Sequence, residues 1–299
     1  MAEPAASTFP DIFPFLRPEV LADPYPVYAM LRTAQPVLRI PLPGTEAGAC
    51  ALTRHDDVQH VLRDARFSAD RRRSEFMQRN RDALPPAIAQ ALLGEQGGLR
   101  SMLIIDPPDH TRVRGLVSKA FTPRRVAGLR DHIQAICDDL LDEVDGRVRI
   151  EVMADLATQL PAIVIAELLG VPPEDRRRFK EWSNDLISLV GNPDAAGAVE
   201  RFERGLESLL SYLRDAIARR RRDPRDDLLS AMIAAQEERD ALTDAELLAT
   251  SNLLLVAGHE TTTNLIGNGL LALLRHPEEC ARLRADPLLV PTAVEEMLR

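Results

Sequence analysis

The chain has 299 residues, 45% of them hydrophobic and 28% charged, and a formal net charge of −9 at pH 7. This length can bury a large core, and the composition is ordinary for a globular protein. The acidic balance excludes nucleic acid as the main partner, because phosphate binding needs a basic face. No window offers the roughly 20 apolar residues of a membrane span, and Met1–Phe9 lacks a signal-peptide pattern. We therefore expect a cytoplasmic protein with no membrane partner.

The pattern along the chain predicts a mainly α fold with a small β portion near the N-terminus. Two β-prone runs at 37–40 and 49–53 flank Pro43-Gly44 and predict a hairpin. The alternation over Val148–Val152 predicts another strand. Shorter helices are predicted at 55–63, 110–119, 124–144, 155–169, 174–189, 198–222 and 226–236.

The strongest helical signal covers 243–275. Thr243–Glu246 reads as a capping box, in which the threonine and glutamate side chains satisfy each other's free amides. His276-Pro277 ends the helix. The stretch 253–258 has no polar residue, so we expect the helix to run through the middle of a core and to be buried there on every face.

Polar residues then interrupt this apolar stretch. A buried carboxylate such as Glu260 costs several kcal/mol unless it is paired, hydrated or protonated, and Gly258 costs about 1 kcal/mol against alanine in a helix. With the Thr261 hydroxyl, this combination suits a small polar ligand in a cavity beside the helix. The alternative is a helix crossing with a water-satisfied glutamate, and the residues alone leave both open. A zinc motif is excluded, because His259-Glu260 would need a histidine where Thr263 stands.

A second cluster of chemistry-bearing residues occupies Asp106–Arg114. Its prolines impose an extended entry, and Asp109 is placed to cap the following helix. His110 and Arg114 are four residues apart and share one helix face, where two donor groups suit a pair of carboxylates. The alternative is a solvated basic face.

The block Ala257–Thr262 after an apolar run resembles the oxygen-activating helix of the cytochromes P-450, which are haem-thiolate monooxygenases. Asp106–Arg114, Ala120–Arg124 and the Glu296–Arg299 pair are similar to further motifs of this family. Softer matches extend back to Asp23-Pro24-Tyr25, so the resemblance spans almost the whole chain. It implies a cytochrome P-450 fold that lacks its C-terminal part, with 1–299 as a single incomplete domain.

The resemblance implies a haem-dependent monooxygenase that inserts one oxygen atom of O2 into a small organic substrate. Thr261 would hydrogen-bond dioxygen, Glu260 would relay protons, and Gly258 would leave room for dioxygen. His110 and Arg114 would hold the haem propionates. The implied sites are Glu260 and Thr261 for catalysis, His110, Arg114, Ala257 and Gly258 for haem binding, and Glu296 and Arg299 as a structural pair.

The family presents its haem ligand as a cysteine in a glycine-containing loop, because thiolate donation favours O–O cleavage. Cys50, Cys137 and Cys280 have no such context, so no iron ligand is predicted within 1–299. The alternative function is a truncated, non-catalytic helical product or interaction module that binds no haem.

Electrons would come from a separate ferredoxin and its NAD(P)H-dependent reductase, because the chain shows no flavin or nicotinamide fingerprint. By the same resemblance, a basic cluster lies near the docking face for that partner, with a solvated helix face as the alternative. Its members are Arg112, Lys119, Arg124 and Arg125.

Overall fold

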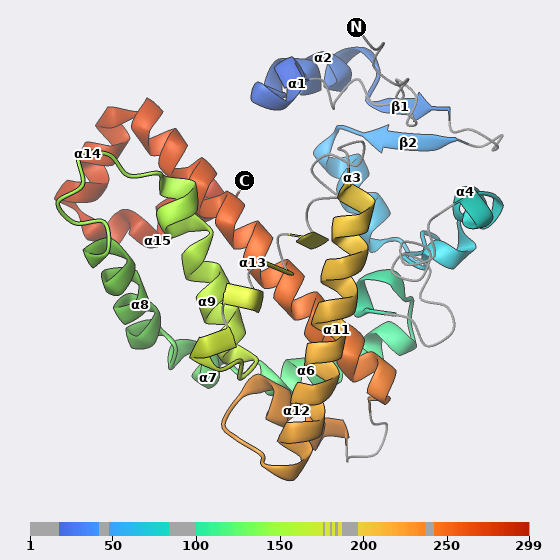
Figure 1. Cartoon of the computed structure of the whole chain (residues 1–299). Coiled ribbons are helices and arrows are strands. Elements are labelled where there is room, and N and C mark those ends of the chain that lie inside the picture. Colours follow the sequence, from blue (N-terminus) through green and yellow to red (C-terminus); the bar gives the residue numbers. More distant parts are fainter. Residues whose placement is uncertain are drawn as a thin grey trace, which may run out of the picture. The chain divides into compact units, whose positions relative to one another are not determined.

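The computed structural model describes residues 18–41, 48–83, 100–175, 177–179, 181–182, 185–186, 197–236 and 242–298. Figure 1 shows a chain built mostly of helices, with a single small hairpin among the residues described. This confirms the mainly α fold class. The chain divides into two compact units, one of residues 1–112 and 192–199 and one of residues 113–191 and 200–299. The single domain over 1–299 stays a prediction.

The first unit holds the β portion. Strands β1 and β2 pair antiparallel with Val37 opposite Leu52, which confirms the hairpin, although its Pro43-Gly44 turn lies outside the described residues. The unit's elements are α1 (Pro18–Ala22), α2 (Tyr25–Ala34), β1 (Val37–Ile40), β2 (Ala49–Leu52), α3 (His55–Arg63) and α4 (Glu75–Arg79), with 3₁₀ turns at Arg71–Arg73, Arg81–Ala83 and Met102–Ile104.

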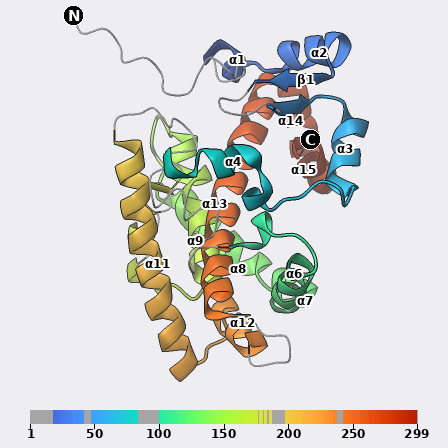
Figure 2. The ribbon, with the colours of Figure 1, turned by 90° about the vertical axis from the view of Figure 1, so that its right-hand side faces the viewer.

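The second unit is built around the longest helix, α13, which packs along α9 and against α12, α14 and α15. Figure 2 shows α14 and α15 beside the C-terminal end of α13. Its helices are α6 (Asp109–Ala120, which begins in the first unit), α7 (Pro123–Ala127), α8 (Arg130–Asp142), α9 (Gln159–Leu168), α11 (Ala198–Arg222), α12 (Leu228–Gln236), α13 (Asp244–Arg275), α14 (Pro277–Ala285) and α15 (Val290–Met297). No helix in the described ranges is long and apolar enough to cross a membrane.

Three predicted elements need correction. The helix expected over 124–144 is two helices, because α7 ends at Ala127 and α8 begins at Arg130. The strand expected at Val148–Val152 is wrong: Val148 is exposed, and no described strand pairs with this segment to satisfy its backbone. Ahead of α9, the helix expected from 155 begins as a π-helical turn at Met153–Ala157. Most of the helix expected at 174–189 lies outside the described residues.

The start of α13 confirms the capping box. Thr243 Oγ1 accepts from the Glu246 amide at 3.2 Å, while the Thr243 amide donates to the Glu246 carboxylate at 2.8 Å. The expectation of burial on every face over 253–258 is wrong. Only Leu255 is buried there and Ala257 is exposed, because α9 covers one side of the helix.

Candidate active site

The middle of α13 presents Ala257 and Thr261 on one exposed face, as their spacing of four residues requires. Thr261 Oγ1 donates to the carbonyl oxygen of Ala257 at 2.6 Å. Glu260 is half-buried. Thr261 is exposed among the described residues, and the expectation that it faces a cavity stays a prediction.

Gly258 lies on the side of α13 that meets α9. A Cβ on Gly258 would lie 3.1 Å from Ile165 Cδ1, so Ile165 fills the space that a side chain at position 258 would occupy. Packing of two helices therefore explains this glycine, as the helix-crossing alternative predicted. Its role in leaving room for dioxygen stays a prediction.

The buried face of α13 also contains polar side chains that the sequence did not single out as a group. His259 and Thr263 are buried one turn apart, with Thr263 Oγ1 lacking a hydrogen-bond partner among the described residues. They lie on the side away from Thr261, because residues two apart on a helix point in nearly opposite directions.

The first two turns of α6 carry His110 and Arg114, which share a face as predicted. His110 is half-buried, and its amide donates to the Asp106 carbonyl at 3.0 Å. Arg114 is exposed and has no carboxylate partner among the residues described. An arginine without a carboxylate and a histidine one turn away fit the chemistry of two propionates, so the residues present fit haem binding at this edge.

The three cysteines stand in unrelated places. Cys50 is exposed in the hairpin, whereas Cys137 and Cys280 are half-buried in helices. Burial and the neighbouring Asp138 raise the pKa of the Cys137 thiol, which disfavours the thiolate that binds metals. In the described part of the chain, no three histidine, cysteine, aspartate or glutamate side chains gather as a metal-binding group.

The pair expected at the end of the chain is only half described. Glu296 lies in α15 beside a cavity of about 430 Å³ between α13, α14 and α15. Arg299 lies outside the described residues. α15 is held against α13 by Met297, whose Sδ lies 2.6 Å from the position of a Cβ on Gly269.

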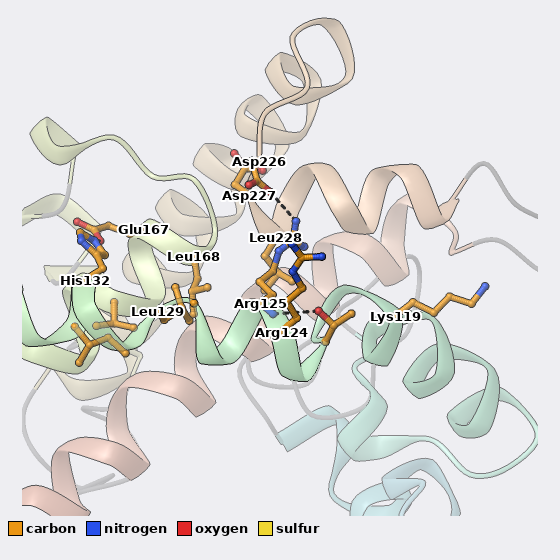
Figure 3. A pocket seen from close by; sticks show the side chains of 14 residues that line it. Lys119, Arg124, Arg125, Leu129, His132, Glu167, Leu168, Asp226, Asp227 and Leu228 are labelled. Atoms are coloured by element: carbon orange, nitrogen blue, oxygen red, sulfur yellow. Dashed lines mark hydrogen bonds and ion pairs between the residues drawn. The ribbon is translucent and has the colours of Figure 1, made fainter.

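A cavity of about 760 Å³ opens between α7, α8, α9 and the loop before α12. Figure 3 shows its charged side chains at two ends, with leucines between them. At one end Arg125 Nη2 pairs with Asp226 Oδ1 at 2.8 Å. At the other, His132 Nε2 contacts the Glu167 carboxylate, a pair 35 residues apart that no sequence motif indicated. None of the residues predicted for catalysis or haem binding lines this cavity, whereas Lys119, Arg124 and Arg125 of the basic cluster do, and we assign it no small-molecule ligand.

Comparison with known proteins agrees with this fold and helix pattern. The cytochrome P450 family model matches residues 36–288. The chain is 41% identical over 287 residues to cytochrome P450 CYP107DY1 of Priestia megaterium, covering 95% of this chain and 69% of the relative. It is 41% identical over 278 residues to vitamin D(3) 25-hydroxylase of Pseudonocardia autotrophica, covering 93% of this chain and 64% of the relative.

The crystal structure of the myxobacterial cytochrome P450 CYP267B1 in complex with myristic acid superimposes with a TM-score of 0.79 at 41% identity. That match covers 95% of this chain and 68% of the solved one. The fold and these matches define the class of haem-dependent monooxygenases. The chain belongs to the cytochrome P450 family and spans about two thirds of the length of these relatives.

Proposed function

We propose that this chain belongs to a cytoplasmic monooxygenase that acts on a small organic substrate. In this proposal α13 faces the bound oxygen, and His110 and Arg114 on α6 bind the haem propionates. The observation that carries the proposal is the exposed Ala257–Thr261 face of α13, in a chain 41% identical to a cytochrome P450 over 95% of its length. Haem, when bound, supplies the activation of O2 for insertion of one oxygen atom. No observation on the described residues favours the non-catalytic alternative.

The α13 residues divide the handling of protons between them. The Thr261 hydroxyl gives its hydrogen to the Ala257 carbonyl, which leaves the oxygen lone pairs as acceptors on the exposed face. Glu260 is the residue immediately before Thr261, and neighbouring residues on a helix do not face each other. A proton held on Glu260 therefore reaches the Thr261 side of the helix through water, not by direct contact.

Thr261→Ala is expected to lower product formed per NAD(P)H consumed severalfold and to raise peroxide release, because the hydroxyl that directs proton delivery is lost. The measurement compares product, peroxide and NAD(P)H in a chain extended through the family's cysteine loop. Thr262→Ala is the matched control, because it removes the same atoms from the next, also exposed, residue of the helix. Equal coupling in both variants would remove Thr261 from proton delivery, and Glu260→Gln tests the carboxylate in the same assay.

We also propose that a ferredoxin with its NAD(P)H-dependent reductase supplies electrons at the basic cluster. Its members are not equivalent. Arg125 is paired with Asp226 at 2.8 Å, and Arg112 lies 3.6 Å from Asp109, so part of their charge is neutralised. Arg124 is exposed and has no ion pair among the described residues, so it offers its full charge to an acidic partner.

Arg124→Glu is expected to slow reduction by the ferredoxin about tenfold at low salt and much less at high salt, because screening removes the long-range attraction. Stopped-flow reduction at several ionic strengths measures this. Arg284→Glu makes the same charge change at an exposed position on α14 and should leave the rates nearly unchanged. Two variants with the same salt dependence would show that net charge, and not docking at Arg124, governs the rate.

A further inference from the structure

The carboxylate of Asp106 joins two segments of the first unit that are far apart in sequence. Its Oδ2 accepts a hydrogen bond from the Ser68 hydroxyl, and its Oδ1 accepts one from the Ala69 amide at 2.8 Å. Arg73 Nη1 lies 3.5 Å from the same carboxylate. Ser68 Oγ in turn accepts from the Asp70 amide at 3.1 Å, so a local hydrogen bond holds the turn in the segment that Asp106 contacts.

The backbone of Asp106 connects these side-chain contacts to α6. Its carbonyl accepts the His110 amide at 3.0 Å, in the first turn of the helix that carries His110 and Arg114. Pro107 and Pro108, which lie between, have no amide hydrogen to donate. One residue therefore holds segment 68–73 through its side chain and the start of α6 through its backbone.

The surroundings of Asp106 favour its charged form. Hydrogen bonds from Ser68 and Ala69 lower its pKa, and the positive charge of Arg73 adds to the effect. A lowered pKa means that this interaction stabilises the fold above the ordinary aspartate pKa and is lost as pH falls through the folded value. The contact is therefore complete at neutral pH.

We propose that Asp106 is a positioning residue for haem, because its double contact fixes the first turn of α6 and so the place of His110 and Arg114. The proposal rests on the propionate-binding role proposed above for those two residues. It goes beyond that role by joining Ser68, which lies 38 residues before Asp106, to the helix that carries His110 and Arg114.

The test removes the contacts of the Asp106 carboxylate with Ser68 and Ala69 and leaves the sequence of α6 unchanged. Asp106→Asn places an amide NH2 where an oxygen now accepts from the Ser68 hydroxyl or the Ala69 amide. In the 299-residue chain, hydrogen exchange of the amides at 110–114 should become about tenfold faster. Asp64→Asn is the matched control: that carboxylate accepts from the Arg66 amide at 2.9 Å and from its guanidinium at 2.6 Å, but reaches no residue of α6 in the described structure. Unchanged exchange in Asp106→Asn, or equal changes in both variants, would overturn the positioning role.

A haem titration of a chain extended through the family's cysteine loop separates this proposal from the one it rests on. Asp106→Asn should raise the haem dissociation constant about tenfold, the lower end of the loss typical for residues that support a ligand. His110→Ala and Arg114→Ala report on the propionate contacts themselves. If these two weaken binding and Asp106→Asn does not, the positioning role is wrong. If neither weakens binding, the propionate assignment is wrong and the positioning role falls with it. Ser68→Ala, a smaller change on the other side of the contact, replaces Asp106→Asn should that variant fail to fold.

Discussion

Asp227→Ala is expected to lower the free energy of unfolding by about 3–5 kcal/mol, the cost of leaving one member of a buried ion pair without its partner. Asp227 and Arg220 are both buried, and the Asp227 carboxylate accepts from Arg220 Nε. The same carboxylate accepts from the Ser230 amide at 2.8 Å and so caps the start of α12. Alanine removes both contacts and leaves the Arg220 charge inside the protein.

A substitution in the turn after α9 gives a second test of the same buried ion pair. Gly170 lies in the turn just after α9 with φ of +73°, and its carbonyl accepts from Arg220 Nη2 at 2.8 Å. A Cβ there would lie 2.2 Å from Asp227 Oδ2, so Gly170→Ala must displace the ion pair as well as strain the backbone. We expect it to destabilise by a few kcal/mol.

Urea unfolding of the 299-residue chain, followed by circular dichroism, measures both changes. Glu279→Ala serves as the control, because its carboxylate lies 2.8 Å from Arg282 on an exposed helix face and should contribute under about 1 kcal/mol. If Asp227→Ala costs no more than Glu279→Ala, the buried pair does not hold α9, α11 and α12 together.

The polypeptide of residues 1–299, reduced with added haem and carbon monoxide, is expected to show no red-shifted Soret band of thiolate-ligated haem. Such a band needs a cysteine thiolate on the iron. Cys50 lies in the hairpin, Cys137 has a raised pKa from burial and Asp138, and Cys280 is half-buried in α14. His110 and Arg114 are exposed or half-exposed, and ion pairs there are worth little without the axial bond.

Absorption spectroscopy after haem titration checks this expectation, with a chain extended through the family's cysteine loop as the positive control. A red-shifted band in the 299-residue chain would mean that one of its three cysteines reaches the iron. Cys50→Ser, Cys137→Ser and Cys280→Ser would then identify which cysteine it is, and the prediction that none of the three ligates iron would be wrong.

Local signals in the sequence led to correct elements wherever neighbouring residues decide the structure. The capping box at Thr243, the hairpin and the bounds of α3 and α11 depend on contacts within a few residues, so the pattern alone predicts them. The strand at Val148–Val152 failed for the opposite reason. A strand is stable only with a neighbour, and the alternation of side chains carries no information about whether one is present.

The sequence by itself indicated the family, through the resemblance of its motifs. It also placed His110 and Arg114 on one helix face, because helical spacing does so without further contacts. Only the tertiary structure decided that Gly258 makes room for Ile165 and that Ala257 and Thr261 lie on the exposed side. Only it joined Ser68 to Asp106 and Gly170 to Arg220. Those contacts link residues 38 and 50 positions apart, and at such separations the packing of whole helices and loops, not local spacing, determines which side chains meet.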